Sequence, residues 1–425
     1  MIAAATNFFY KISLMLVMVF SVRMTIPYLG VERYGIWVTI SGLAGFLNFF
    51  DLGVGNALIN RVAEVTPSHN SKRLCNSVSG GLTALGGVSL VMGGFFYLLA
   101  MLIPWNEFLK IADEEIYLET FQTIKIFSIL FAINVFADGI SKIFYGIQRV
   151  YEANLFRIVG AFLTLFFIWN AIKGNGGMPA LLIASMSGAI LANFALMAVL
   201  VIRKQFSFNN IFSNVMGELP YLIKSGGLFF FLQIGVTVLG SVDNLIIVNY
   251  LGAAMVAMYS VVQKLFQFST QPCLMINNSL WPAYANAKKH GDHHFILQTF
   301  KRSMFFTLIL SGAVGLVLVL FGRSIISFWT HGDLVVPYAL LAAYCVWCSI
   351  DAVSNAFGMY LNGLSLLKPQ MKGLTTLIVL GLPLKVYLLS QFGIEAMLIG
   401  FSVFFLANHL FWAGYVYREL IFKKM

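Results

Sequence analysis

Several charged side chains, eight of them candidates for chemistry, lie inside segments of the chain that are otherwise almost wholly apolar. An ionisable group inside a bilayer is costly, so it marks a substrate or ion path by default. Arginine binds a diphosphate through two parallel hydrogen bonds and lysine acts on it as a point charge, whereas shielded carboxylates can exchange protons or cations. The sequence therefore offers four candidates for binding a diphosphate, which are Arg23, Lys125, Lys264 and Lys385. It offers four more for gating or ion coupling, which are Asp51, Asp138, Asp243 and Asp351.

Simpler roles compete for several of these residues. Arg23 and Lys385 lie near the ends of their apolar segments, from which long basic side chains can extend to the membrane interface. Asp138 and Lys142 are spaced i, i+4, so a local ion pair is as good an interpretation as a proton relay. Asp51 lies just before a glycine-rich turn, where packing or gating competes with binding.

The chain carries no pattern typical of an enzyme active site or a metal centre. The sequence contains no nucleophile elbow, phosphate-binding glycine loop, zinc-binding helix or usefully spaced carboxylate pair. Cys345 and Cys348 match C-x-x-C, but inside an apolar segment they are expected to be packing residues. Asp292-His293-His294 lacks further spaced ligands. We therefore expect no enzyme activity, no metal and no cofactor.

The composition indicates a membrane protein. Of 425 residues, 59% are hydrophobic and 10% are charged, against roughly 45–50% and 25% in a soluble domain. In a soluble protein a net charge of +10 would suggest a nucleic-acid partner. In a membrane protein the positions of the Lys and Arg relative to the spans indicate orientation instead, so we expect no nucleic acid as a partner. The longest polar stretches are too short to enclose a core of their own, namely 61–76, 105–119, 203–218 and 284–299.

Because a span needs about twenty apolar residues, the sequence predicts about twelve membrane-spanning helices. Eighteen Lys and Arg then fall on one side of the membrane, four on the other and five within spans. By the positive-inside rule this predicts a multi-pass protein of a bacterial inner membrane with both termini in the cytoplasm. The predicted spans are 6–28, 35–59, 77–103, 119–146, 153–172, 178–202, 221–248, 251–274, 299–321, 333–361, 371–390 and 394–417.

Two short matches indicate an internal duplication. Tyr28-Leu-Gly30 recurs as Tyr250-Leu-Gly252, offset by 222 residues, and the segment 177–183 resembles 393–399, offset by 216. Each pair follows an odd-numbered span, so the halves have the same orientation and form parallel repeats. We expect an N-terminal six-helix bundle over 1–205, a cytoplasmic linker over 206–220 and a C-terminal six-helix bundle over 221–425.

Several segments resemble a known family. The sequence YLGVERYGIW over 28–37 and DLGVGNAL over 51–58, followed by Arg61, match the pattern of the first two spans of the polysaccharide-unit flippases, including O-antigen flippases. The segments 145–148 (YGIQ) and 361–363 (LNG) are further matches. These flippases belong to the multidrug/oligosaccharidyl-lipid/polysaccharide exporter superfamily. The resemblance covers nearly the whole chain and rests on fold-level patterns rather than a catalytic signature.

The resemblance implies a V-shaped pair of helical bundles around a cationic cavity. Its expected activity is flipping an undecaprenyl-diphosphate-linked oligosaccharide from the cytoplasmic to the periplasmic leaflet, with membrane lipids and other polysaccharide assembly proteins as further partners. An ion gradient of protons or sodium is the expected energy source if transport is coupled. Family resemblance supports a functional arginine in the first span, which is Arg23 here.

Two other functions fit parts of the sequence. A multidrug cation antiporter of the same superfamily would share the fold and repeat, but it needs acidic groups in its cavity, whereas this chain has at least as many basic residues in its spans. A membrane polysaccharide polymerase or ligase would need a large periplasmic loop, and the segment 105–119 is too short for one. Both are weaker interpretations than the flippase.

The repeat also suggests a gate. Asp243 falls two positions from the repeat equivalent of Arg23. If the halves face one another there, the two side chains would pair at the periplasmic end, and the pair would open when a substrate phosphate replaces the carboxylate.

Overall fold

A computed structural model describes residues 2–43, 51–66, 71–207, 209, 214–222, 224, 230, 242–364 and 366–422. All regular structure in this part of the chain is helical. The chain divides into two compact units, residues 1–254 and 255–425. The predicted bundle boundaries around the linker 206–220 differ from this division, and they stay a prediction because much of 208–241 lies outside the described residues.

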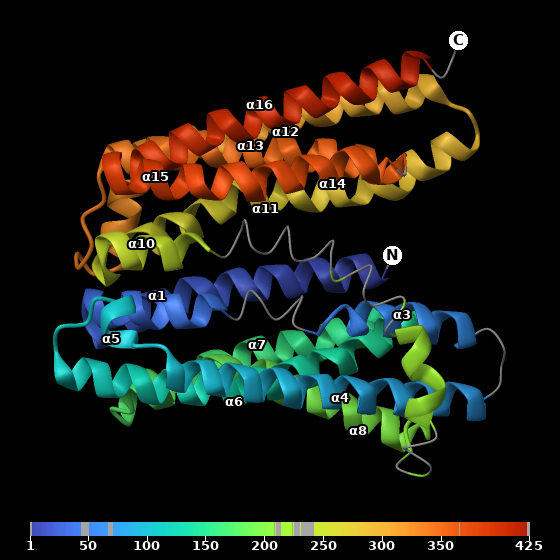
Figure 1. Cartoon of the computed structure of the whole chain (residues 1–425), viewed down its shortest axis with the longest axis horizontal. Helices are drawn as coiled ribbons and strands as arrows, with labels where there is room; N and C mark the ends of the chain where they lie inside the picture. Colours follow the sequence, from blue (N-terminus) through green and yellow to red (C-terminus); the bar gives the residue numbers. More distant parts are fainter. Residues whose placement is uncertain are drawn as a thin grey trace. The chain divides into compact units, whose positions relative to one another are not determined.

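The first unit is a bundle of long antiparallel helices (Figure 1). Within it α7 packs against α8 and α1, and α6 packs against α4, α8 and the short α3. The helices are α1 (Ile2–Gly42), α3 (Val54–Val65), α4 (Ser71–Leu102), α5 (Trp105–Phe108), α6 (Glu114–Gly146), α7 (Val150–Lys173), α8 (Gly177–Ile202) and α10 (Asp243–Leu251).

The second unit is also helical, and its helices pack mainly around α13. Contacts join α13 to α12 and α16, and the ring of Tyr344 on α13 packs on Tyr259 and Phe266 of α11. The elements are α11 (Ala253–Lys289), α12 (His293–Trp329), α13 (Tyr338–Gly363), α14 (Leu367–Thr376), a π-helical turn η3 (Leu377–Gly381), α15 (Leu382–Phe392) and α16 (Ile394–Phe422).

Nine helices among the described residues are long and apolar enough to cross a membrane. The predicted seventh span, 221–248, lies largely outside these residues, and α11, which contains the predicted eighth span, is not among the nine. The chain is thus a multi-pass membrane protein, and the count of twelve stays a prediction. The nine are Ala5–Gly42, Ser71–Leu102, Glu114–Gly146, Val150–Lys173, Gly177–Ile202, His293–Trp329, Tyr338–Gly363, Pro369–Phe392 and Ile394–Gly414.

The glycines of the repeated tripeptide have nearly the same backbone conformation. Gly30 has φ 73° and ψ 168°, which divides α1 into two helices, and Gly252 between α10 and α11 has φ 87° and ψ 173°. Only glycine adopts this region readily, because a Cβ would clash with the backbone. The duplicated sequence therefore specifies the same sharp turn twice. Gly393, in the second repeated segment, has φ 87° and ψ −174°.

Alanine at either turn glycine should destabilise the protein. We expect Gly30→Ala and Gly252→Ala each to cost about 1–3 kcal/mol of backbone strain. Gly94→Ala is the matched control, because Gly94 lies within α4 at negative φ and an added Cβ meets nothing within 4 Å. Thermal unfolding of the purified protein in detergent tests this. Equal melting temperatures for all three variants would contradict the assignment of the turn conformation.

Candidate functional site

The Asp51 carboxylate organises the turn that starts α3. Its Oδ1 accepts a hydrogen bond from the Gly53 amide at 2.8 Å and its Oδ2 accepts one from the Gly55 amide at 3.2 Å. Gly53 has φ 73° at the N-cap of α3, which favours glycine. A Cβ on Gly55 would overlap both the Asp51 carboxylate and the Lys142 side chain. The DLGVG motif thus builds a tight turn around one buried carboxylate, which is 3% exposed.

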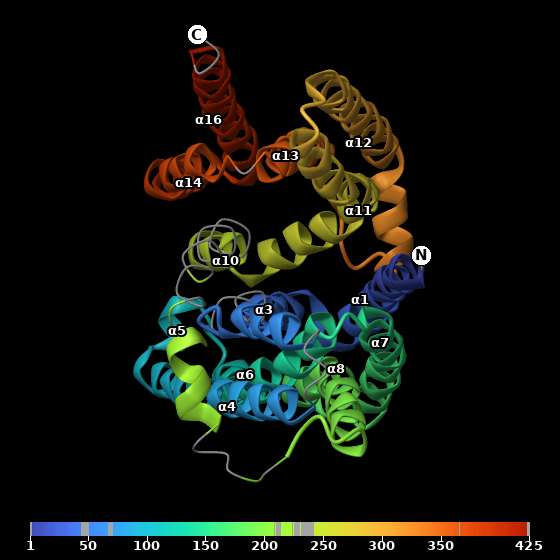
Figure 2. The ribbon, with the colours of Figure 1, turned by 90° about the vertical axis from the view of Figure 1, so that its right-hand side faces the viewer.

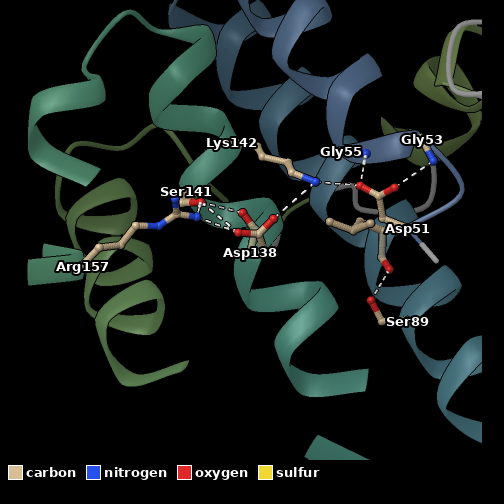
Figure 3. Close-up of polar contacts among 9 residues, drawn as sticks. Asp51, Gly53, Gly55, Ser89, Asp138, Ser141, Lys142 and Arg157 are labelled. Carbon is tan, nitrogen blue, oxygen red and sulfur yellow. Dashed lines mark hydrogen bonds and ion pairs between the residues drawn. The ribbon is translucent and has the colours of Figure 1, made fainter. Parts of the chain in front are cut away.

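Lys142 on α6 joins Asp51 to a second carboxylate (Figure 3). Its Nζ lies 2.7 Å from Asp51 Oδ2 and 3.3 Å from Asp138 Oδ2, and its side chain is 12% exposed. The second contact confirms the local pair predicted from the i, i+4 spacing. The closer partner of Lys142, however, comes from a turn 91 residues earlier, which helical spacing could not indicate.

Arg157 on α7 completes the cluster. Its Nη2 donates to Asp138 Oδ1 and to Ser141 Oγ, each at 2.6 Å, and its Nη1 donates to the Tyr145 hydroxyl at 2.7 Å. The guanidinium also lies 5.8 Å from the centre of the Tyr10 ring on α1. Two carboxylates and two cations therefore form a closed set with no net charge. This set, the four-residue cluster Asp51, Asp138, Lys142 and Arg157, ties together the α3 turn, α6 and α7.

Two members of this cluster, Lys142 and Arg157, are not among the candidate site residues predicted from the sequence. They lie on α6 and α7, and their side chains are 12% and 17% exposed. An available signal was the spacing of Asp138 and Lys142 on one helix. The contact between Arg157 and Asp138 crosses two helices and depends on the packing of α7 near α6. The gating or coupling roles assigned to Asp51 and Asp138 stay predictions.

A second polar contact holds part of the predicted linker to the first unit. Glu218, in the helical residues 214–222, accepts from Arg61 Nε at 2.6 Å and Nη2 at 3.2 Å, and from Ser77 Oγ at 2.7 Å. These hydrogen bonds to the Glu218 carboxylate raise the pKa of Arg61 above its usual range. The Arg61 that follows the DLGVG motif thus fastens the 214–222 helix to α3 and α4.

At the other end of the first unit, residues of the YLGVERYG segment contact α6 and α8. Arg33, in the YLGVERYG segment, lies 3.4 Å from Glu119 on α6. Glu119 Oε1 accepts from the Met178 amide at 2.7 Å, and the Gly177 amide donates to the Tyr28 hydroxyl at 2.9 Å. The two repeated sequence elements therefore meet within this unit, at the start of α8.

In the second unit, Lys385 is buried among aromatic rings. The side chain is on α15, the residue is 2% exposed, and its Nζ lies 4.1 Å from the centre of the Phe401 ring and 5.7 Å from that of Trp347. Asp351 on α13 interacts with it electrostatically. The alternative of an interfacial anchor for Lys385 is wrong, because the ammonium lies inside the bundle. One predicted phosphate ligand and one predicted coupling carboxylate therefore lie close enough to interact electrostatically.

The remaining candidates lie on separate helices. Lys125 on α6 is partly buried with its Nζ 4.5 Å from the centre of the Phe121 ring, and among the described residues it forms no ion pair. Arg23 is partly buried on α1, and Asp243 is buried in the first turn of α10. These two helices pack against one another, but the Arg23–Asp243 gate stays a prediction. Lys264 is partly buried on α11.

Removing the shared cation should expose the electrostatic cost of the cluster. We expect Lys142→Met to lower stability by about 3–5 kcal/mol, because it leaves two carboxylates short of a buried partner. The double variant Asp51→Asn with Lys142→Met should lose clearly less stability than Lys142→Met alone. Arg149→Met is the control, since its pair with Glu152 is surface-exposed on the Arg149 side and worth about 0.2–1 kcal/mol.

Thermal unfolding in detergent measures these differences. A double variant as unstable as Lys142→Met alone would show that Lys142 acts through packing rather than through its charge.

Curated proteins similar to this chain are named as O-antigen exporters. A "Putative O-antigen export protein" of Yersinia pseudotuberculosis is 21% identical and covers 99% of this chain and 96% of its own length. A "Putative O-antigen transporter" of Salmonella typhi is 22% identical, covering 100% and 97%. The MatE family model matches residues 229–387. These proteins are transporters, which confirms the expectation that the chain is not an enzyme.

Solved structures with the same fold are membrane transporters. The "Lipid II flippase MurJ, inward closed conformation" superimposes with a TM-score of 0.74 at 15% identity, covering 97% of this chain and 87% of that one. An inward-facing "multidrug resistance MATE family transporter of the MOP superfamily" gives 0.71 at 14% identity, covering 95% and 98%. With the relatives above, these matches agree with the resemblance drawn from the sequence motifs: the chain is similar in sequence to O-antigen exporters and shares the fold of these two membrane transporters.

Proposed function

We propose that this protein flips an undecaprenyl-diphosphate-linked oligosaccharide, an O-antigen or similar repeat unit, across a bacterial inner membrane. Transport runs from the cytoplasmic to the periplasmic leaflet by alternating access, and both termini lie in the cytoplasm. The full-length similarity to O-antigen exporters and the fold shared with a lipid II flippase support a lipid-linked saccharide as substrate. The excess of Lys and Arg in alternate loops supports the orientation.

The observation that carries the choice of an anionic substrate is the compensation of the carboxylates inside the first unit. Asp51 and Asp138 are held there by Lys142 and Arg157. A cationic drug needs carboxylates that are available to pair with it. The fold shared with multidrug transporters does not separate the two functions, whereas this pairing favours the lipid-linked diphosphate over a cation.

Coupling to protons or sodium is part of the proposal. Asp138 is the most accessible carboxylate of the four-residue cluster, with its side chain 32% exposed. Its protonation or cation binding would compete with Lys142 and Arg157 and so loosen the contact between α6 and α7. Other polysaccharide assembly proteins are expected to supply the substrate and to consume the product.

Deletion of the gene in a host that makes O-antigen or capsule tests the function. We expect lipid-linked repeat units to accumulate on the cytoplasmic face and surface polysaccharide to fall, with restoration by the intact chain. Normal surface polysaccharide in a host without a second exporter would reject the assignment.

A single lysine in the first unit should separate substrate binding from packing. We expect Lys125→Ala to lower polysaccharide export by about tenfold, the effect of losing one charge-assisted contact to phosphate. Lys125→Arg should retain most export because it keeps the charge. Lys173→Ala is the control, since Lys173 also lies over a ring, that of Trp169, but at the end of α7. Equal export by the Lys125→Ala and Lys173→Ala variants would remove Lys125 from the substrate path.

The proposed gate makes a separate prediction. If Asp243 pairs with Arg23, Asp243→Asn should weaken the closed state and shift the protein towards the outward-facing form. Labelling of single cysteines placed along the periplasmic half of α1 measures this, with expression matched to the parent. Unchanged accessibility of these cysteines in the Asp243→Asn protein would contradict the proposed gate but not the flippase assignment.

A further inference from the structure

The second unit contains an elongated cavity that belongs to neither charged pair described above. Its volume is about 770 Å³, within the range of small-molecule sites. Most of its lining comes from α12, α13 and α16, and α11 contributes Lys288. The ribbons of α12 and α16 diverge from one another in Figure 2. Along α13 the lining runs from Ile350 to Leu364, which is roughly 21 Å at the α-helical rise. This length is about two-thirds of the ~30 Å hydrocarbon core.

The body of the cavity is apolar. Ile296, Phe300 and Met304 line the α12 side and Phe357 the α13 side. The rings of Phe300 and Tyr360 pack at 4.4 Å between centres and form part of one wall. Such a lining accepts a hydrocarbon chain and offers little to a saccharide, which needs many hydrogen-bonding groups.

The cavity also opens sideways towards the membrane. Leu297 on α12 and Leu406 and Leu410 on α16 line it while remaining 54%, 41% and 64% exposed. All three lie within helices that are long and apolar enough to cross a membrane, so we expect lipid chains to reach this opening. A lipid chain can enter there without crossing water.

The lysine of the described lining lies at one end of the cavity, with a histidine near it. Lys288, at the end of α11, and His293, in the first turn of α12, line the cavity where α13 ends. Lys288 Nζ donates to the Leu364 carbonyl oxygen at 2.7 Å, which holds the ammonium at the rim and leaves two of its three donors. None of the described lining residues is acidic. The distribution of loop charges predicts that this end faces the cytoplasm, where basic pockets between helices bind lipid phosphates.

The polar pair deeper in the cavity is already satisfied. His409 Nδ1 lies 2.8 Å from the Phe405 carbonyl oxygen, which can only accept, so this nitrogen carries a proton. His409 Nε2 lies 2.6 Å from Ser354 Oγ and accepts from that hydroxyl when the imidazole is neutral. The deep end therefore presents an internally bonded pair rather than a free charge, and the phosphate site is confined to the rim.

We propose that this cavity binds the hydrocarbon chain of a phosphate-headed membrane lipid, with the phosphate at Lys288 and His293. The chain lies along α13 between α12 and α16. Two lipids share this chemistry, a bulk anionic phospholipid and a polyprenyl phosphate carrier. The proposal stands apart from the proposed transport function, because binding is measured on purified protein without flipping.

Photo-crosslinking of the full-length protein in detergent micelles tests the site. The probes carry a diazirine in the hydrocarbon chain and are phosphatidylglycerol, a polyprenyl phosphate and the uncharged polyprenol. We expect phosphate-bearing probes to label α12, α13 and α16 at the cavity residues. Labelling of these helices by phosphatidylglycerol alone identifies a bulk-lipid site, and labelling by polyprenyl phosphate alone identifies a carrier-lipid site; each supports the proposal.

Two pairs of variants make the test specific. Leu297→Trp should fill the cavity and reduce labelling at least fivefold, whereas Leu316→Trp, on the same helix and 62% exposed but outside the cavity, should not. Lys288→Glu should reduce labelling by phosphate-bearing probes about fivefold and leave polyprenol unchanged. Lys301→Glu is its control, an exposed lysine outside the cavity.

Absence of cavity labelling by both phosphate probes would overturn the proposal. Equal labelling by polyprenol, with no effect of Lys288→Glu, would overturn its phosphate site.

Discussion

A charge inside a lipid-embedded bundle has to be compensated by another charge or by water, and this constraint organises the first unit. Lys142 places one ammonium between two carboxylates, 2.7 Å from Asp51 and 3.3 Å from Asp138, and Arg157 holds the second carboxylate from the neighbouring helix. A buried ion pair is costly to break but contributes little net stability. The main effect of these ion pairs is therefore to fix the positions of the elements that carry them. They fix the turn before α3 against α6 and α7.

The same constraint explains sequence features that are hard to interpret one at a time. Gly53 and Gly55 in the DLGVG motif are needed because the backbone wraps closely around the Asp51 carboxylate, and one of them leaves room for Lys142. Arg61, a few residues later, is satisfied by Glu218 in the 214–222 helix. Residues that look like a family signature are therefore a set of electrostatic contacts that hold one end of the first unit together.

The second unit meets the constraint differently and leaves more space. Lys385 is shielded by the rings of Phe401 and Trp347 beside Asp351, so its charge is kept within the bundle rather than at the interface. The cavity along α13 is apolar with a lysine at its rim, and none of its described lining residues is a carboxylate. A protein that moves an amphiphile across a membrane needs polar and apolar binding surfaces, and in this unit the two occur in different places.

The sequence by itself determined the membrane class, the helical fold, the repeat and the family resemblance. These depend on hydropathy, helix length and glycines with special backbone conformations, which are local properties; Gly30 and Gly252 adopt the same turn because the same tripeptide recurs. Helical spacing also predicted the pair Asp138–Lys142.

Only the tertiary structure decided which charges meet across helices. Asp51 and Lys142 are 91 residues apart, Arg157 pairs with Asp138 through packing, and Lys385 is buried although it lies near the end of its span. The cavity could not be predicted from the chain either, because its lining comes from separate segments of α11, α12, α13 and α16 that only the packing of the helices brings together. Hydropathy gives the depth of a residue in the membrane, but the direction in which its side chain points is set by the packing of neighbouring helices.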